Sequence, residues 1–116
     1  MMARPGTDPV RNGKESEMHT YFLATKLSPE SAVDATAIKD NGKKWLDSVK
    51  RNCPEVKWLD HYALFGQYDF ISIFQAPDVD TAAKVSVISM SLGAQKAESW
   101  PAIPYGDFIK MLDTID

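Results

Sequence analysis

The sequence predicts an α+β protein with a four-stranded antiparallel sheet, in the split βαβ order β-α-β-β-α-β followed by a C-terminal helix. Two runs rich in aromatic and β-branched residues meet at Gly66-Gln67, as the strands of a β-hairpin do. Segments with apolar residues at helical spacing lie on both sides of this hairpin, and a further strand-like run stands at each end. With 116 residues, the chain is expected to form one domain.

The first strand and helix are expected after a polar N-terminal segment. Residues 1–18 contain prolines, glycines and charges without an apolar run, which predicts a disordered extension. Residues 19–27 are rich in β-forming side chains and predict a strand. Ser28-Pro29 predicts the start of a helix, and apolar residues recur at helical spacing up to Cys53. Asn41-Gly42 is a poor helix interior and predicts a kink or a short break.

The hairpin follows Pro54, with strands expected over residues 55–65 and 68–75. Gly66 can supply the positive φ that a short connection between strands requires. Phe70 and its neighbours place apolar groups on both faces of the second of these strands. We therefore expect the hairpin to lie in the middle of the sheet, covered on both sides.

The second helix is expected to begin after Asp78, whose carboxylate suits an N-terminal cap, and to extend to about Leu92. Its residues are apolar around more of the circumference than one buried face requires, which predicts cover on two sides. Gly93 suits the C-terminal cap of this helix.

The last strand is expected over residues 94–103, with Pro101 and Pro104 keeping it at an edge of the sheet, and residues 105–112 predict a short final helix. Both main helices of a split βαβ fold lie on one face, so the other face of the sheet needs cover. We expect a second copy of the chain to supply this cover, forming a two-fold dimer. The apolar residues expected on that face are Trp58, Tyr62, Phe70 and Phe74.

Charge and cysteine content narrow the functional classes. The net charge is −3, from 13 basic and 16 acidic residues, and nothing in it favours a nucleic-acid partner. The single Cys53 excludes an internal disulfide. Residues 1–18 have no apolar run that could serve as a signal peptide or membrane span, so we expect a cytoplasmic protein with no membrane partner, its domain covering residues 19–116.

A family resemblance rests on the hairpin. Residues 65–70, Phe-Gly-Gln-Tyr-Asp-Phe, together with Ile73-Phe74-Gln75-Ala76-Pro77-Asp78 and the alanine-rich helix that follows, resemble the GYD domain family. The likeness extends from about Tyr21 to Met111. It implies a ferredoxin-like fold in the dimeric α/β-barrel group, which includes cofactor-free monooxygenases, muconolactone isomerase, haem-containing chlorite dismutases and the effector domains of leucine-responsive regulators. It implies no established activity for the GYD family itself.

Two residues are candidates for proton transfer. His61 shares a strand face with apolar groups and is either a proton shuttle or a structural histidine. Asp69 begins a strand in apolar surroundings, where it is either an acid or base with a raised pKa or an acceptor of backbone N–H groups at the turn. The two histidines and Cys53 show no metal-ligand spacing, and no cofactor is expected.

The remaining candidates would bind and orient a ligand. Tyr62, Tyr68, Trp58 and Trp100 either line a pocket for a flat organic molecule or fill the core and a dimer interface. Ser72 lies between two isoleucines and needs a hydrogen-bond partner, and Glu98 faces either a cavity or water.

Two hypotheses of function remain open. The first is a homodimer or higher oligomer that binds a small apolar or aromatic metabolite. If it is an enzyme, it would be a cofactor-independent isomerase or monooxygenase, with His61 or Asp69 as the base and Tyr62 or Tyr68 as the orienting donor. The alternative is a non-catalytic module for effector sensing or oligomer assembly, which uses the sheet and the second helix. A closed pocket with converging polar groups would favour the first hypothesis.

Overall fold

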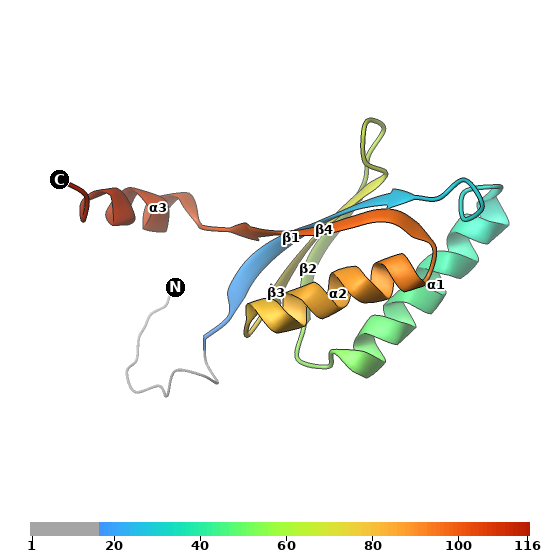
Figure 1. Cartoon of the computed structure of the whole chain (residues 1–116), viewed down its shortest axis with the longest axis horizontal. Helices are drawn as coiled ribbons and strands as arrows, with labels where there is room; N and C mark the ends of the chain where they lie inside the picture. The colour runs from blue at the N-terminus through green and yellow to red at the C-terminus, as the bar shows by residue number, and fades with distance from the viewer. Residues whose placement is uncertain (1–16) are drawn as a thin grey trace.

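The predicted order of strands and helices is confirmed by a computed structural model, which describes residues 17–116 (Figure 1). The expected extension over residues 1–18 falls, except for Glu17 and Met18, outside the described residues. The elements are β1 (His19–Leu27), α1 (Ala35–Asn52), β2 (Lys57–Ala63), β3 (Phe70–Ala76), α2 (Val79–Ser91), β4 (Ala94–Ala102) and α3 (Tyr105–Leu112).

The four strands form one antiparallel sheet in the order β2-β3-β1-β4, and α1 and α2 lie together on one side of it (Figure 1). The hairpin β2–β3 is therefore not in the middle of the sheet as expected. Of the two hairpin strands, β3 is an inner strand and β2 lies at an edge, because β3 pairs with both β2 and β1. The expectation that β4 lies at an edge is confirmed.

Helix α1 begins later than predicted and has no break. Its N-cap is Asp34, whose Oδ1 accepts a hydrogen bond of 2.8 Å from the Ala37 N–H, whereas Ser28-Pro29 lies in the turn before the helix. The helix continues through Asn41-Gly42. A glycine in a helix costs only about 1 kcal/mol relative to alanine, and packing of the apolar face of a long helix outweighs this cost.

The connection between β2 and β3 also differs from the prediction. It is longer than a two-residue turn, and Gly66 does not have a positive φ. Asp69 holds this loop to the sheet: its N–H donates to the Thr25 carbonyl at 2.8 Å, and its Oδ2 accepts from the Leu27 N–H at 2.8 Å. These bonds fix the loop, so no tight glycine turn is needed.

Both predicted caps of α2 are confirmed. Asp78 Oδ1 accepts hydrogen bonds from the N–H and the Oγ1 of Thr81, at 2.8 and 2.7 Å, and these bonds lower the pKa of the Asp78 carboxyl. Gly93 follows the helix with φ 108°, a conformation that a residue with a side chain rarely adopts. Its carbonyl accepts hydrogen bonds from Ser28 N–H at 3.1 Å and Ser31 Oγ at 3.0 Å.

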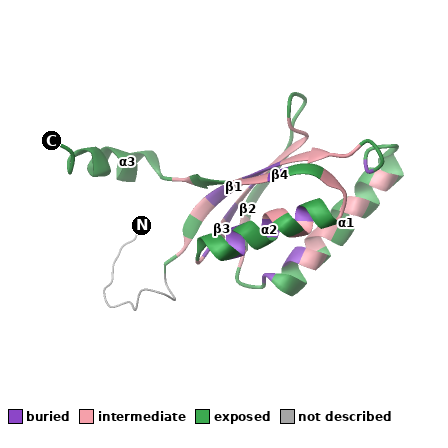
Figure 2. Ribbon diagram, viewed as in Figure 1, coloured by how far each residue is buried: buried purple, intermediate pink, exposed green. Residues whose placement is uncertain are grey.

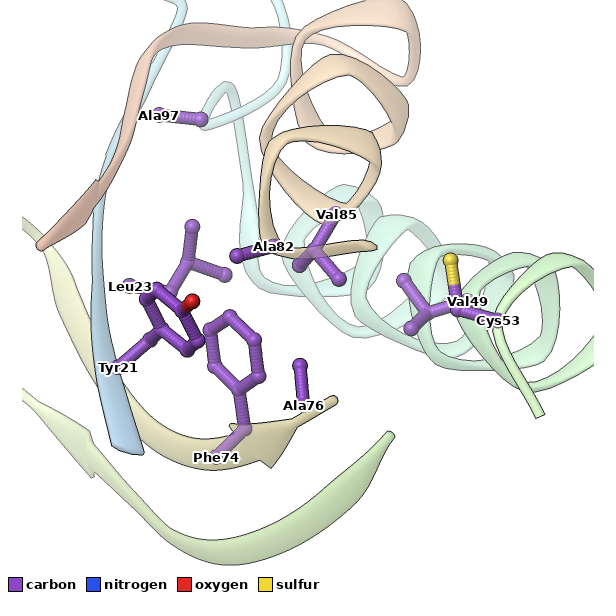
Figure 3. Packing of buried hydrophobic residues seen from close by; sticks show 9 residues of the cluster. All are labelled: Tyr21, Leu23, Val49, Cys53, Phe74, Ala76, Ala82, Val85 and Ala97. Carbon is purple, nitrogen blue, oxygen red and sulfur yellow. The ribbon is translucent and has the colours of Figure 1, made fainter. Parts of the chain in front are cut away.

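The core lies between the sheet and the two helices (Figure 3). Phe74 is fully buried at its centre, stacked on Tyr21 with ring centroids 5.4 Å apart and tilted against Trp58 at 5.1 Å. The expectation that Phe74 and Trp58 lie on the uncovered face is therefore wrong. The pairing register places both on the helix side, because Trp58 is opposite Phe74. The same expectation is wrong for Phe70, which shares this face of β3 with Phe74 and lines the cavity described below. Tyr62, opposite Ile71, lies on the uncovered face as expected. The other buried apolar residues of the core are Leu23, Val49, Cys53, Ala76, Ala82, Val85 and Ala97.

Two helices leave apolar side chains in solvent. Val79, Val87 and Met90 of α2 are 64%, 59% and 48% exposed, so the expected cover on its second side is absent from the described chain. Helix α3 lies beyond the end of the sheet and has no buried residue (Figure 2). No helix in residues 17–116 is long and apolar enough to span a membrane.

Candidate functional site

A cavity of about 370 Å³ lies between α1 and the helix-covered face of the sheet. It is located where β1 ends and β3 begins, so the pocket forms at one end of the layered structure. Most of its wall is apolar, and none of its lining residues carries a fixed charge. The lining residues are Thr25, Leu27, Ile38, Asn41, Gly42, Trp45, Leu46, His61, Tyr62, Ala63, Phe70, Ser72, Ser89, Leu92 and Ala94.

Two hydrogen-bonded pairs supply polar groups to this wall. His61 and Ser72 are direct neighbours across the β2–β3 register, and His61 Nδ1 lies 2.9 Å from Ser72 Oγ. On the helix side, Trp45 Nε1 donates to Ser89 Oγ at 2.8 Å, and this hydroxyl donates to the Val85 carbonyl at 2.8 Å. Ser72 and Ser89 are buried, so each hydroxyl satisfies its need for a partner within the protein.

Aromatic rings support the imidazole of His61. Its ring centroid lies 5.2 Å from that of Trp58 and 6.1 Å from that of Trp45, and the two tryptophans contact each other at 5.2 Å. Trp45 and His61 line the cavity and Trp58 packs behind His61, so the two tryptophans restrict the orientation of the imidazole.

The environment of His61 favours its neutral form. Partial removal from water lowers the pKa of His61, with a smaller opposing effect from the Asp60 carboxylate beside it. Partial burial therefore shifts the imidazole toward its uncharged form. With Nδ1 engaged by Ser72, Nε2 is the ring nitrogen left to interact with a ligand.

Tyr68 and Glu98 form a separate cluster on the opposite face of the sheet. Tyr68 Oη donates to Glu98 Oε2 at 3.1 Å, Trp100 Nε1 donates to Glu98 Oε1 at 2.9 Å, and the two rings meet edge to face at 5.8 Å. The bonds from Trp100 and Tyr68 lower the pKa of Glu98, whereas partial desolvation and the bond to Glu98 raise the pKa of Tyr68. Neither residue lines the cavity, so the structure does not bring them together with His61.

Of the other predicted site residues, some line the cavity and others lie outside it. His61, Tyr62 and Ser72 line the cavity, and Trp58 stacks behind His61 without lining it. The Asp69 carboxylate accepts a hydrogen bond from the Leu27 N–H of β1 and does not line the cavity. This contact agrees with the interpretation of Asp69 as an acceptor of backbone N–H groups at the turn.

Residues of the helix wall were missed by sequence reasoning. Trp45, Asn41 and Ser89 line the cavity. The sequence placed Trp45 only on the apolar side of the first helix and Asn41 only at a kink, and it gave no signal for Ser89. The signal that could have located them is Gly42: a glycine inside a helix leaves space, and a Cβ built on it meets no atom within 4 Å.

The fold and the site together define a ferredoxin-like α+β protein with an uncharged cavity between its first helix and its sheet. Residues 21–112 match the GYD domain family, and the chain belongs to this family. The resemblance seen in the hairpin motif is thereby confirmed.

Two known proteins are similar to this chain. The "Glutamine synthetase and cystathionine beta-lyase binding protein" of Thermus thermophilus is 27% identical over 95 residues, which are 82% of this chain and 99% of that protein. The crystal structure of MtbAldR superimposes with a TM-score of 0.53 at 15% identity, covering 89% of this chain and 61% of that one. This chain thus spans less than two thirds of MtbAldR, and the likeness concerns the fold alone.

Proposed function

We propose that this protein binds a small, neutral and largely apolar molecule in the cavity between α1 and the sheet. The observation that carries the proposal is the cavity itself: its volume of about 370 Å³ suits a small ligand, and its lining has hydrogen-bonding groups but no fixed charge. A charged ligand would lose its hydration there without gaining an ion pair. A planar ring would pack against the aromatic wall and bond the free nitrogen of His61.

An enzymatic form of this proposal assigns proton transfer to His61. A neutral imidazole with one nitrogen held by Ser72 is suited to accept a proton from a bound substrate through the other nitrogen. Such chemistry is cofactor-independent isomerisation or a related oxygenation. Tyr62 borders the cavity, but it is opposite Ile71 in the strand register, which places its side chain on the uncovered face, so it is not the orienting donor.

A matched pair of aromatic probes tests the proposed ligand class. We expect naphthol, which is neutral at neutral pH, to bind at least about tenfold more tightly than naphthoate, because an unpaired carboxylate is costly to bury. His61→Ala should weaken naphthol binding, whereas Asp60→Ala, at the neighbouring exposed position of β2, should change it little. Isothermal titration calorimetry measures all four affinities.

The pH dependence adds a second readout. Because the pKa of His61 is lower in the folded state than in the unfolded chain, stability should be full above the ordinary histidine pKa and decrease as the pH falls below it. Naphthol affinity should decrease at lower pH still, as the pH falls through the depressed pKa of His61 in the folded state and the cavity gains a charge. Equal affinities for the two probes, or equal effects of the two substitutions, would contradict the proposal.

Pairing of two copies through the uncovered sheet face is part of the proposal. The strand register places Phe22, Ile71 and Ile73 on this face, beside Trp100, which is 41% exposed. A patch of this kind marks an interface more often than a free surface. Sedimentation equilibrium at micromolar concentration distinguishes a dimer from a monomer, and Ile73→Glu should favour the monomer.

A second candidate function is protein binding through α2. Val79, Ala83, Val87 and Met90 form one exposed apolar stripe along this helix. The similar Thermus protein is named for binding glutamine synthetase and cystathionine beta-lyase, so these enzymes are the first partners to test. Val87→Glu should abolish binding in surface plasmon resonance while the adjacent Lys84→Ala should not, and the absence of binding by the unaltered chain would exclude both enzymes as partners.

A further inference from the structure

Helix α3 is strongly amphipathic yet has nothing to pack against in the described chain. It contacts no other helix or strand, and all of its residues are exposed (Figure 2). Its polar side chains, Asp107 and Lys110, share the opposite side of the helix from the apolar ones. The apolar side is formed by Tyr105, Phe108, Ile109, Met111 and Leu112, with Ile115 continuing it.

A helix of this length requires a partner. Helix α3 has 8 residues, and isolated helices shorter than about 12 residues are marginal in water. Its stability must therefore come from packing of the apolar side against another surface.

The connection to β4 directs α3 away from its own sheet. Pro101 and Pro104 restrict the residues before them to extended conformations, and Pro104 itself is extended with φ −53° and ψ 138°. The chain therefore continues in the direction of β4 and places α3 past the end of the sheet (Figure 1). Because α3 is directed away from its own sheet, residues 17–116 of the same chain offer no surface for its apolar side, whereas a second copy can offer one.

The opposite end of the sheet offers a complementary surface. The loop between β2 and β3 rises on the side that α1 and α2 leave uncovered, and its Phe65 is 99% exposed with Leu64 beside it (Figure 1). At the same end, Lys26 of β1 and Lys96 of β4 are directly opposite each other. Two like charges in this position are unfavourable. Glu98, on the same face of β4, offsets part of the Lys96 charge, and a further acidic group would add to this.

The charge of the C-terminal segment matches this lysine pair. Residues 105–116 contain three aspartates, Asp107, Asp113 and Asp116, against the single Lys110. The segment therefore offers apolar side chains for the exposed loop and negative charge for the lysines.

The area of the uncovered face supports the same arrangement. Strands of nine, seven, seven and nine residues make a face of roughly 500 Å² in projection. A stable interface buries about 800 Å² of accessible surface on each partner, so contacts at the ends of the sheets would add to the pairing. In a two-fold dimer the α3 of each copy packs against the other copy, so the contact occurs twice and adds buried area at both ends of the paired sheets.

We propose that α3 of one copy packs against the β2–β3 loop and the Lys26–Lys96 pair of a second copy. The inference rests on the proposed pairing of the uncovered faces, with the two-fold axis running across the strands. This axis brings the end of β4 in one copy to the end of the other sheet at which its lysine pair and its β2–β3 loop lie. The α3 helices then hold the dimer at both ends.

Cross-linking in a mixed dimer tests which chain receives α3. A photoreactive benzoylphenylalanine replaces Phe108 in ¹⁵N-labelled protein, which is mixed with an excess of unlabelled chain before irradiation. We expect heavy–light cross-linked peptides that contain Leu64 or Phe65. Cross-links within one chain, or to another part of the second copy, would overturn the proposal.

Sedimentation equilibrium measures the contribution of the contact. Phe108→Asp and Phe65→Asp should each raise the dimer dissociation constant by about tenfold or more, whereas Lys110→Ala on the polar side of α3 should change it less. Unchanged dissociation constants in a dimeric protein would overturn the α3 contact while the sheet pairing stands. A monomeric unaltered chain would overturn both. Circular dichroism checks that each variant keeps its fold.

Discussion

Replacement of Phe74 by alanine is expected to lower the free energy of unfolding by about 3–5 kcal/mol. The side chain is fully buried between Tyr21 and Trp58, so the substitution loses its transfer free energy and leaves a cavity between two aromatic rings. A domain of this size has a free energy of unfolding of about 5–15 kcal/mol, so the substitution would remove a large part of it. Urea denaturation followed by circular dichroism measures the change.

The control for this substitution is Phe65→Ala, which removes the same atoms from a side chain that is 99% exposed. Measured under dilute conditions where dimers do not contribute, it should change stability by no more than about 0.5 kcal/mol. Similar losses for the two variants would show that Phe74 is not the centre of the core.

Replacement of Gly93 by alanine is expected to cost about 2–4 kcal/mol, for two separable reasons. The φ of 108° is unfavourable for any residue with a Cβ, and the added Cβ would collide with Ser31 Oγ. The collision is serious because Ser31 is buried and its hydroxyl donates to the Gly93 carbonyl. Thermal and urea unfolding both report this loss.

Two further variants separate the reasons. Gly93→Ala in a Ser31→Ala background removes the collision and should recover part of the loss, leaving the cost of the backbone conformation. Gly42→Ala, where the added Cβ meets no atom within 4 Å inside α1, should instead stabilise the protein by about 0.5–1 kcal/mol. Destabilisation by Gly42→Ala would indicate that the open space at this position is absent.

The fold could be predicted from the sequence where local chemistry determines it. Asp78 and Gly93 have the chemistry of the two helix ends at which they lie, and residues 105–112 were delimited correctly. The start of α1 was not, because Ser28-Pro29 fits a helix start as well as the turn that it forms. The position of β2 at the edge follows from pairing between distant strands, which the hairpin sequence does not contain.

The strand residues of the site could be predicted from the sequence, but the covered face of the sheet and the helix wall could not. His61 and Ser72 were recognised as polar residues in apolar strands, and the register makes them neighbours. Tyr68 and Glu98 were placed in the same site because a strand sequence does not state which face is covered. The helix wall around Trp45 depends on how α1 crosses the sheet, which involves residues far apart in the chain.

The three tryptophans of the chain are divided between its two surfaces. Trp45 lines the cavity and Trp58 lies behind His61, whereas Trp100 lies on the uncovered face beside Tyr68. Intrinsic fluorescence can therefore distinguish two events without an attached dye. In a Trp100→Phe variant the remaining emission reports occupancy of the pocket, and in a Trp45→Phe/Trp58→Phe variant it reports association of two chains.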